Sequence, residues 1–374
     1  MIIKIEREGT VGGLAQVIDD LSQRTSVQGL LILACDDNGF TPDNIDPLLK
    51  RIALPFFGGV FPQIINGREQ MSRGTIVAGL PRTPDVQIIT GLSDPSLVFD
   101  EVLERQIPVT GEIKTMFVFV DGLASRIGAL IDGLFNIFGL EFSYLGGGAG
   151  SLSMRRKPCL FTNQGLLQDC ATLAMVDIRS GVGVAHGWQP ISGPYSVTES
   201  DRNVIQTLDW RPAFEIYKEI VERDSGRVFA TDNFFDIAKY YPFGISKIDA
   251  ESIVRDPVMK REDGALVCVG EVPPQAQVDI LTADVESLVA AATKALSMGL
   301  KSYSGAPEDR VLLFMDCISR VLCLKEDYHL ELDAVCNSGL PVIGALTIGE
   351  IANSGKSYLE FYNKTAVVGV VEGR

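Results

Sequence analysis

Three side chains at the ends of two apolar segments have the types needed to hold a small zwitterion. Cys317 and Arg320 lie where the apolar run VLLFMDC (311–317) ends, and Glu350 follows Gly349 at the end of a glycine-containing run. The ends of such strands are the usual place for functional side chains in α/β sheets. A guanidinium binds a carboxylate through two parallel hydrogen bonds, and a carboxylate binds an ammonium group. Arg320 and Glu350 therefore predict a pocket for an amino-acid-like ligand, and a structural Arg–Glu ion pair is the alternative.

The most glycine-dense point of the chain is GGGAG (146–150). Backbone without Cβ atoms can approach a ligand closely and can offer N–H groups to an anion. The segment is not a P-loop, which needs a Lys, and it is not a dinucleotide fingerprint, because a β segment follows it. Gly146, Gly147 and Gly148 are thus candidate ligand contacts, and the close crossing of two packed strands is the alternative.

Of the two histidines, only His186 lies in a setting typical of a site, because it ends an apolar segment and precedes Gly187 and Trp188. An imidazole there could bind a ligand, a metal or the iron of a haem, which needs only one good axial ligand from the protein. The alternative is a hydrogen-bonded structural histidine. His329 is surrounded by charged residues, and we expect it at the surface.

Motifs of nucleophilic catalysis are missing. Neither G-x-S-x-G nor S-x-x-K occurs, and the seven cysteines include no C-x-x-C pair. A Cys–His pair would require Cys317 and His186 to meet in the tertiary structure. We therefore expect no catalytic residues and no certain cofactor, and an unrecognised enzyme is the last of three hypotheses.

Composition restricts the class of partner. The chain has 374 residues, 46% of them hydrophobic, and a formal net charge of −15. Its longest basic run is Arg155-Arg156-Lys157, too short for a nucleic-acid surface. No stretch approaches the roughly 20 apolar residues that span a bilayer, and the N-terminus does not resemble a signal peptide. We expect a cytoplasmic protein without nucleic-acid or membrane partners.

One pattern occurs three times, as an apolar strand, a helix, a glycine-containing strand and a β pair. In the first copy we expect Asp46 to cap a helix with Pro47 at its first position. The predicted fold is α/β, with mixed sheets built from three βαββ-like units and outer helices. The sequence leaves open whether the units surround one pseudo-axis. The copies open at 29–35, 116–120 and 311–317.

A different stretch separates the second and third copies. Pro212 begins a predicted helix whose apolar residues, such as Tyr217 and Ile220, repeat at helical spacing. Two short strands and a further helix follow. We place a domain boundary near Trp210, which gives domains at 1–211 and 212–374.

Four segments together resemble the FIST family of sensory domains. Three of them resemble the N-terminal module and its junction, and the fourth, CISR…PVIGALTIGEI…NKTA, resembles the C-terminal module. This last block adds Asn363 to the candidate site and also contains Cys317, Arg320 and Glu350. In the first copy, the family's pattern contains an acidic residue, whereas this chain has FFGGVFPQI and lacks it. A ligand contact at that point is therefore in doubt. The segments lie at 145–150, 186–188, 207–217 and 317–366.

The resemblance implies two FIST modules that bind a small ligand such as an amino acid and regulate a separate signalling protein. In the family that protein is often a histidine kinase or a cyclic-dinucleotide enzyme. Some members are known to bind haem and sense nitric oxide, which makes a haem sensor with His186 as iron ligand the second hypothesis. Whether the chain forms homo-oligomers stays open.

Overall fold

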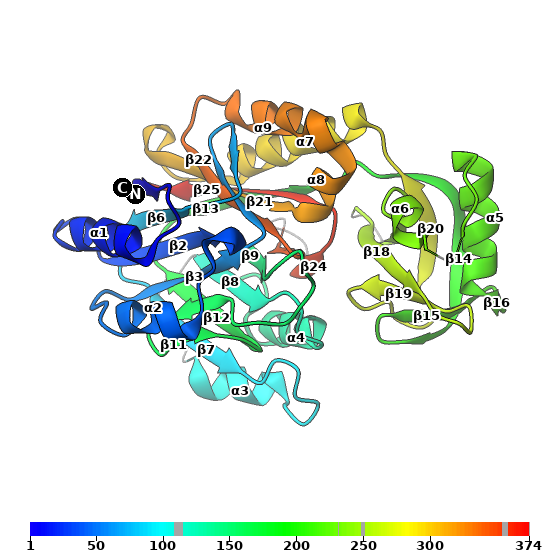
Figure 1. The fold of residues 1–374 in the computed structure, drawn as a ribbon, viewed down its shortest axis with the longest axis horizontal. Coiled ribbons are helices and arrows are strands. Elements are labelled where there is room, and N and C mark those ends of the chain that lie inside the picture. The colour runs from blue at the N-terminus through cyan, green and yellow to red at the C-terminus, as the bar shows by residue number, and fades with distance from the viewer. Residues whose placement is uncertain (108–114, 231, 248–250, 354–357, 374) are drawn as a thin grey trace.

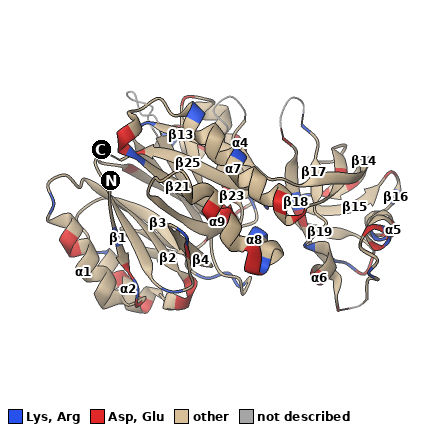
Figure 2. Ribbon diagram, turned by 90° about the horizontal axis from the view of Figure 1, so that it is seen from above, with Lys and Arg blue, Asp and Glu red and all other residues tan. Residues whose placement is uncertain are grey.

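The computed structural model describes residues 1–107, 115–230, 232–247, 251–353 and 358–373. Its strands form three six-stranded sheets and one seven-stranded barrel sheet. The three sheets and their helices form one body, and the barrel lies beside it (Figure 1). The view from above shows the same separation, so the barrel is an appendage and not a layer of the main body (Figure 2).

The first two units share one order of elements, namely an edge strand, a helix, two parallel strands around a second helix, a hairpin and a closing strand. The first unit comprises β1 (Ile2–Glu6), α1 (Val11–Ser22), β2 (Gly29–Cys35), a 3-10 turn (Asp36–Asn38), α2 (Pro42–Leu49), β3 (Phe56–Phe61), β4 (Gln63–Asn66), β5 (Glu69–Met71) and β6 (Thr75–Leu80). The second comprises β7 (Asp85–Thr90), α3 (Phe99–Gln106), β8 (Thr115–Asp121), α4 (Ile127–Phe138), β9 (Ser143–Ala149), β10 (Leu160–Thr162), β11 (Gly165–Leu167) and β12 (Cys170–Val176).

The third unit has the same order but is interrupted by the barrel after its edge strand. It comprises β13 (Ser180–Ala185), α7 (Val285–Ser302), a 3-10 turn (Pro307–Asp309), β21 (Arg310–Cys317), α8 (Ile318–Leu324), a 3-10 turn (Lys325–Asp327), α9 (Tyr328–Cys336), β22 (Val342–Thr347), β23 (Glu350–Ala352), β24 (Glu360–Tyr362) and β25 (Ala366–Glu372). The barrel comprises β14 (Gln189–Asp201), β15 (Val204–Leu208), β16 (Arg211–Pro212), α5 (Ala213–Ser225), α6 (Phe234–Ala238), β17 (Phe243–Ile245), β18 (Ile253–Lys260), β19 (Leu266–Val269) and β20 (Gln277–Thr282).

The three units exchange their hairpins in a closed cycle. The hairpin β4–β5 of the first unit pairs with β22 of the third, β23–β24 of the third pairs with β9 of the second, and β10–β11 of the second pairs with β3 of the first. Each six-stranded sheet therefore contains four strands of one unit and the hairpin of a neighbour. This exchange places the three units around one pseudo-threefold axis, which the sequence leaves open.

A glycine occupies the same register position in all three units. Gly58, Gly146 and Gly344 lie opposite Ile32, Val118 and Phe314 on the neighbouring parallel strand. A Cβ atom at any of the three would come within 1.9 Å of the carbonyl oxygen of its partner. Because only glycine avoids this clash, the recurrence of the residue reflects strand packing. It also confirms that the three segments are structurally equivalent.

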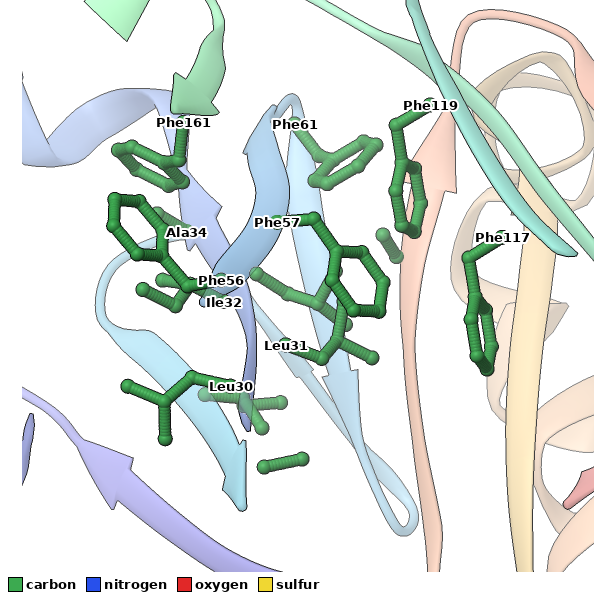
Figure 3. Packing of buried hydrophobic residues seen from close by; sticks show 14 of the residues in the cluster. Leu30, Leu31, Ile32, Ala34, Phe56, Phe57, Phe61, Phe117, Phe119 and Phe161 are labelled. Atoms are coloured by element: carbon green, nitrogen blue, oxygen red, sulfur yellow. The ribbon is translucent and has the colours of Figure 1, made fainter. Parts of the chain in front are cut away.

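The main core lies where the sheets of the first and second units face each other. Phe57 of β3 contacts Phe117 and Phe119 of β8, with ring centroids 5.2 and 6.2 Å apart (Figure 3). All three rings are fully buried. Burial of a side chain of this size stabilises the fold by about 1.5–3 kcal/mol, so these contacts hold the two units together.

The predicted α/β fold with mixed sheets, three units and outer helices is confirmed, and one detail of the prediction was wrong. The helix of the first copy begins at Pro42 and not at Asp46, because Thr41 and Asn44 form a capping box there. Pro47 consequently lies inside the helix. Residues 196–203 are mostly polar, yet most of them lie in the long strand β14. There, pairing with strands on both sides overrides their weak strand propensity.

The barrel closes because β14 pairs with both β15 and β20. The domain boundary predicted between residues 211 and 212 falls at β16, within the strand order of this barrel, and it stays a prediction. Within the described part of the chain, no helix combines the length and hydropathy that a membrane crossing requires.

Candidate functional site

Arg320 lies at the centre of a fully buried polar cluster between α8, α9 and the end of β13. Its Nε and Nη2 donate to Glu331 Oε1 at 2.8 and 2.5 Å, and its Nη1 donates to the carbonyl oxygens of His186 and Lys364. Its Nη2 also donates to the carbonyl oxygen of Leu288 at 2.9 Å. These five hydrogen bonds match the five N–H groups of a guanidinium, which leaves no free donor for a ligand.

Two carboxylates share this single arginine. Glu331 accepts two of the hydrogen bonds, and Asp316 Oδ1 lies 3.2 Å from Arg320 Nε. Burial raises the pKa of both carboxyl groups, and Glu331 raises that of Asp316 further. The arginine thus forms a structural ion pair, as the alternative interpretation of the sequence expected, but its main partner is Glu331 and not Glu350.

Glu350 is fully buried at the start of β23 and is held by neighbouring polar groups. Its Oε1 accepts a hydrogen bond from Thr347 Oγ1 at 2.7 Å, and its Oε2 accepts one from the Thr365 backbone N–H at 3.2 Å. Burial raises the pKa of Glu350 to about 8, against smaller opposing contributions that include Cys317 and Arg320. Burial also raises the pKa of the Cys317 thiol, so that this cysteine is protonated and not a reactive thiolate.

His186 is 7% exposed, and both of its ring nitrogens have contacts. Nδ1 accepts a hydrogen bond from the Trp188 backbone N–H at 2.9 Å, and Nε2 lies 3.2 Å from Ser252 Oγ. Burial lowers the pKa of His186 to about 4, so the ring is neutral at neutral pH. In this conformation neither nitrogen is open toward an iron, so the residue does not fit an axial haem ligand. Haem binding by the chain stays a prediction.

The glycine triplet lies in β9, against the start of the exchanged hairpin from the third unit. Gly147 pairs with Glu350, and the Gly148 backbone N–H donates to the Gly349 carbonyl oxygen at 2.8 Å. The backbone groups of this stretch therefore bind the neighbouring strand. A ligand would have to displace part of the sheet to reach them.

The buried polar cluster is a property of the third unit alone. The register of the parallel strands and the exchanged hairpins identifies the equivalent positions in the other two units. These positions carry apolar residues, namely Ala34 and Val120 in place of Asp316, and Ile64 and Leu160 in place of Glu350.

A cavity of about 280 Å³ lies beside this cluster, between the barrel, α6 and the start of α8. Of the predicted residues, Cys317 and Asn363 line it. Asp256 of β18 also lines it and forms a buried ion pair with Lys364 at 3.2 Å. The structure thus brings Cys317 and Asn363 to one cavity. Arg320 and Glu350 line neither this cavity nor the cleft between α4 and the barrel.

A larger cleft of about 820 Å³ separates the second unit from the barrel. One wall is α4, with Ile131, Asp132 and Phe135, and the other is formed by the barrel strands β18 and β19. Figure 1 shows α4 facing these strands. The exchanged hairpin contributes Glu360 and Phe361. Clefts of this size between two structural bodies are the usual place for small-molecule sites.

Successive residues of β18 serve the two cavities. Arg255 lines the larger cleft and Asp256 lines the smaller cavity, because successive side chains of a strand point to opposite faces. Met154, Val258 and Val269 line both cavities, so the two share a wall. Sequence reasoning assigned no function to Arg255 or Asp132. No local pattern could have identified this pair, because β18 and α4, which form the two walls of the cleft, are far apart in the sequence.

Among the described residues, no group of three or more His, Cys, Asp or Glu side chains is placed to hold a metal ion. The arrangement can therefore be described through hydrogen bonds, ion pairs and apolar contacts. It combines a rigid polar cluster with two adjoining cavities at the contact between the barrel and the three-unit body.

Comparison with known proteins gives two matches that together cover most of the chain. Residues 29–211 match the model described as the FIST N domain, and residues 213–353 match that of the FIST C domain. No curated protein matches the chain. FIST domains are sensory domains of signal transduction. The chain therefore belongs to the FIST family of sensory domains.

Proposed function

We propose that the protein is a sensor that binds a small, amino-acid-like metabolite in the 820 Å³ cleft between α4 and the barrel. The observation that supports this is the composition of the cleft, in which an apolar wall faces charged groups of both signs. Ile131 and Phe135 supply the apolar wall, and Arg255, Asp132 and Glu360 supply the charges. A zwitterion with an apolar side chain complements both parts.

Binding in this cleft offers a physical route to a signal. The cleft lies between two bodies, so a ligand that contacts both favours one relative position of the barrel over others. The shared wall at Val258 and Val269 connects the cleft to the cavity that contains Cys317 and Asn363. We propose that the resulting change acts on a separate cytoplasmic signalling protein, such as a histidine kinase or a cyclic-dinucleotide enzyme.

A cleft-filling variant tests the location of the site. Val267 is a half-buried residue of β19 in the cleft wall, and Val228 is 69% exposed outside it. The twenty amino acids serve as probes in thermal-shift and calorimetric measurements on the full chain. We expect at least one probe to bind the wild type and Val228→Trp equally, and to bind Val267→Trp at least tenfold more weakly. Equal binding by both variants, or binding of no probe, would refute the proposal.

A further inference from the structure

Arg255 differs from the other buried arginine of the site in lacking a carboxylate partner. It is 7% exposed, and no ion pair joins its guanidinium to a described Asp or Glu within 4.0 Å. A buried charge is strongly disfavoured unless a group of opposite charge compensates it. Burial accordingly lowers the pKa of Arg255 from its ordinary value. Arg320, by contrast, has both Glu331 and Asp316 beside it.

Backbone carbonyl groups fix the position of the Arg255 guanidinium. Nε donates to the Glu271 carbonyl oxygen at 2.8 Å, and Nη1 donates to the carbonyl oxygens of Val254 and Phe361 at 3.1 and 3.0 Å. Gly270 adopts a φ of +83°, and a Cβ atom there would lie 2.9 Å from Arg255 Nε. The missing side chain of Gly270 therefore leaves the space that the guanidinium occupies.

The remaining nitrogen, Nη2, is available to the cleft. It has no hydrogen-bond partner among the described residues, although all three contacts above orient the group to which it belongs. Among the described residues, the buried side-chain atoms that have neither solvent contact nor a hydrogen-bond partner are six oxygens. Nη2 of Arg255 is not one of these atoms although it has no partner, so it retains some surface in contact with solvent. Since Arg255 lines the cleft, this surface is where a ligand can reach the guanidinium.

The carboxylates around the cleft have other partners or lie apart from the guanidinium. Glu360 is paired with Lys247 at 2.8 Å, and the Glu271 side chain lies near Gly128 of α4. Asp132 is exposed on α4, and its pKa is raised by partial desolvation and by Glu360. Glu360 and Glu271 raise the pKa of Arg255 from a distance, but no described carboxylate forms an ion pair with it. The carboxylates of the cleft can also attract an ammonium group.

We infer that Arg255 is the recognition residue for a carboxylate of the ligand, so the cleft selects small monocarboxylates over their uncharged analogues. This assignment rests on the proposed function, since it concerns the same cleft. An anion at Nη2 supplies the missing counter-charge and forms a charge-assisted hydrogen bond, which is about twice as strong as a neutral one. The shared chemistry is the carboxylate, which a free amino acid or a 2-hydroxy acid could supply.

A ligand series on the unchanged full-length protein tests the inference without any effect on folding. The probes are the amino acids that bind the wild type, their carboxamides and the corresponding 2-hydroxy acids, measured by calorimetry. We expect the carboxamides to bind about 10- to 100-fold more weakly than the acids, because they lose the charge-assisted bond. If the hydroxy acids bind as well as the amino acids, the ligand carboxylate alone is the recognised group. If the hydroxy acids bind more weakly, Asp132 and Glu360 also recognise the ammonium group of the ligand.

Arg255→Lys supplies the second measurement, since it keeps the positive charge but loses the fixed fork. The acids should bind this variant about tenfold more weakly, whereas the carboxamides should be unaffected. Carboxamides that bind the wild type as tightly as the acids would overturn the role of Arg255 while leaving the cleft as the site. Failure of every probe to bind would instead refute the proposed function itself.

Discussion

Replacement of Arg320 by alanine should destabilise the fold and should not act as a selective loss of ligand binding. The substitution removes five buried hydrogen bonds and leaves Asp316 and Glu331 without their cation. Breaking a buried ion pair by deleting one partner costs about 3–5 kcal/mol. The carbonyl oxygens that lose their donors add about 1 kcal/mol or more each. Because whole domains are stable by about 5–15 kcal/mol, the variant should be largely unfolded or close to it.

Urea unfolding followed by tryptophan fluorescence measures this loss. Trp188 is 2% exposed and donates from Nε1 to the Lys364 carbonyl oxygen, the same atom that Arg320 Nη1 contacts. Trp210 is 85% exposed, so a Trp210→Phe background leaves a signal that reports on the cluster.

Arg211→Ala is the matched control for Arg320→Ala. Arg211 pairs with Glu219 at the surface, where solvent screens the two charges, so its removal should leave the free energy of unfolding close to that of the wild type. The role of Arg320 as a ligand-binding residue makes the opposite forecast, namely lost binding with an intact fold. An Arg320→Ala protein whose free energy of unfolding lies within about 1 kcal/mol of the wild type would refute the structural interpretation.

Three further predictions concern the titration of Glu350, the titration of His186 and the binding of haem. Burial raises the pKa of Glu350 to about 8, so the folded protein retains a proton that the unfolded chain has lost, and stability should fall as pH rises from about 5 to 8. This single group changes the free energy of unfolding by about 1.4 kcal/mol per pH unit. Between pH 5.5 and 7.5, Glu350→Gln should therefore reduce the pH dependence of the free energy of unfolding, measured in urea, by about that amount. The same pH dependence in the wild type and the variant would contradict the prediction. For His186, whose pKa is lowered to about 4, the stabilising neutral form is lost as pH falls from about 6.5 toward 4, and His186→Gln should reduce this acid-side loss. Because both His186 ring nitrogens have hydrogen-bond contacts, haem added to the purified protein should keep the Soret band of free haem, and a shifted band that His186→Ala abolishes would restore the haem hypothesis.

The sequence alone was sufficient for the order of strands and helices in the three units, because strand and helix periodicity are local properties, but it did not predict the axis that relates the units or the closure of the barrel. The apolar runs that open the three copies became β2, β8 and β21. The exposure of His329 also followed from the charged residues that surround it. The order of motifs along the chain identified the family.

The tertiary structure decided what each polar residue contacts, because those contacts join segments that are far apart in the sequence. Arg320 was expected to act with Glu350, but the return of α9 places Glu331 beside it instead. The cyclic exchange of hairpins brings Glu360 and Phe361 next to a helix of another unit, and no local pattern encodes this exchange. Arg255 is a single arginine in a short strand, and only the folded chain shows that its charge is buried, oriented and without an ion-pair partner among the described residues. Most of the secondary structure of the three units therefore followed from the sequence, whereas the proposed binding site depends on long-range contacts that only the fold creates.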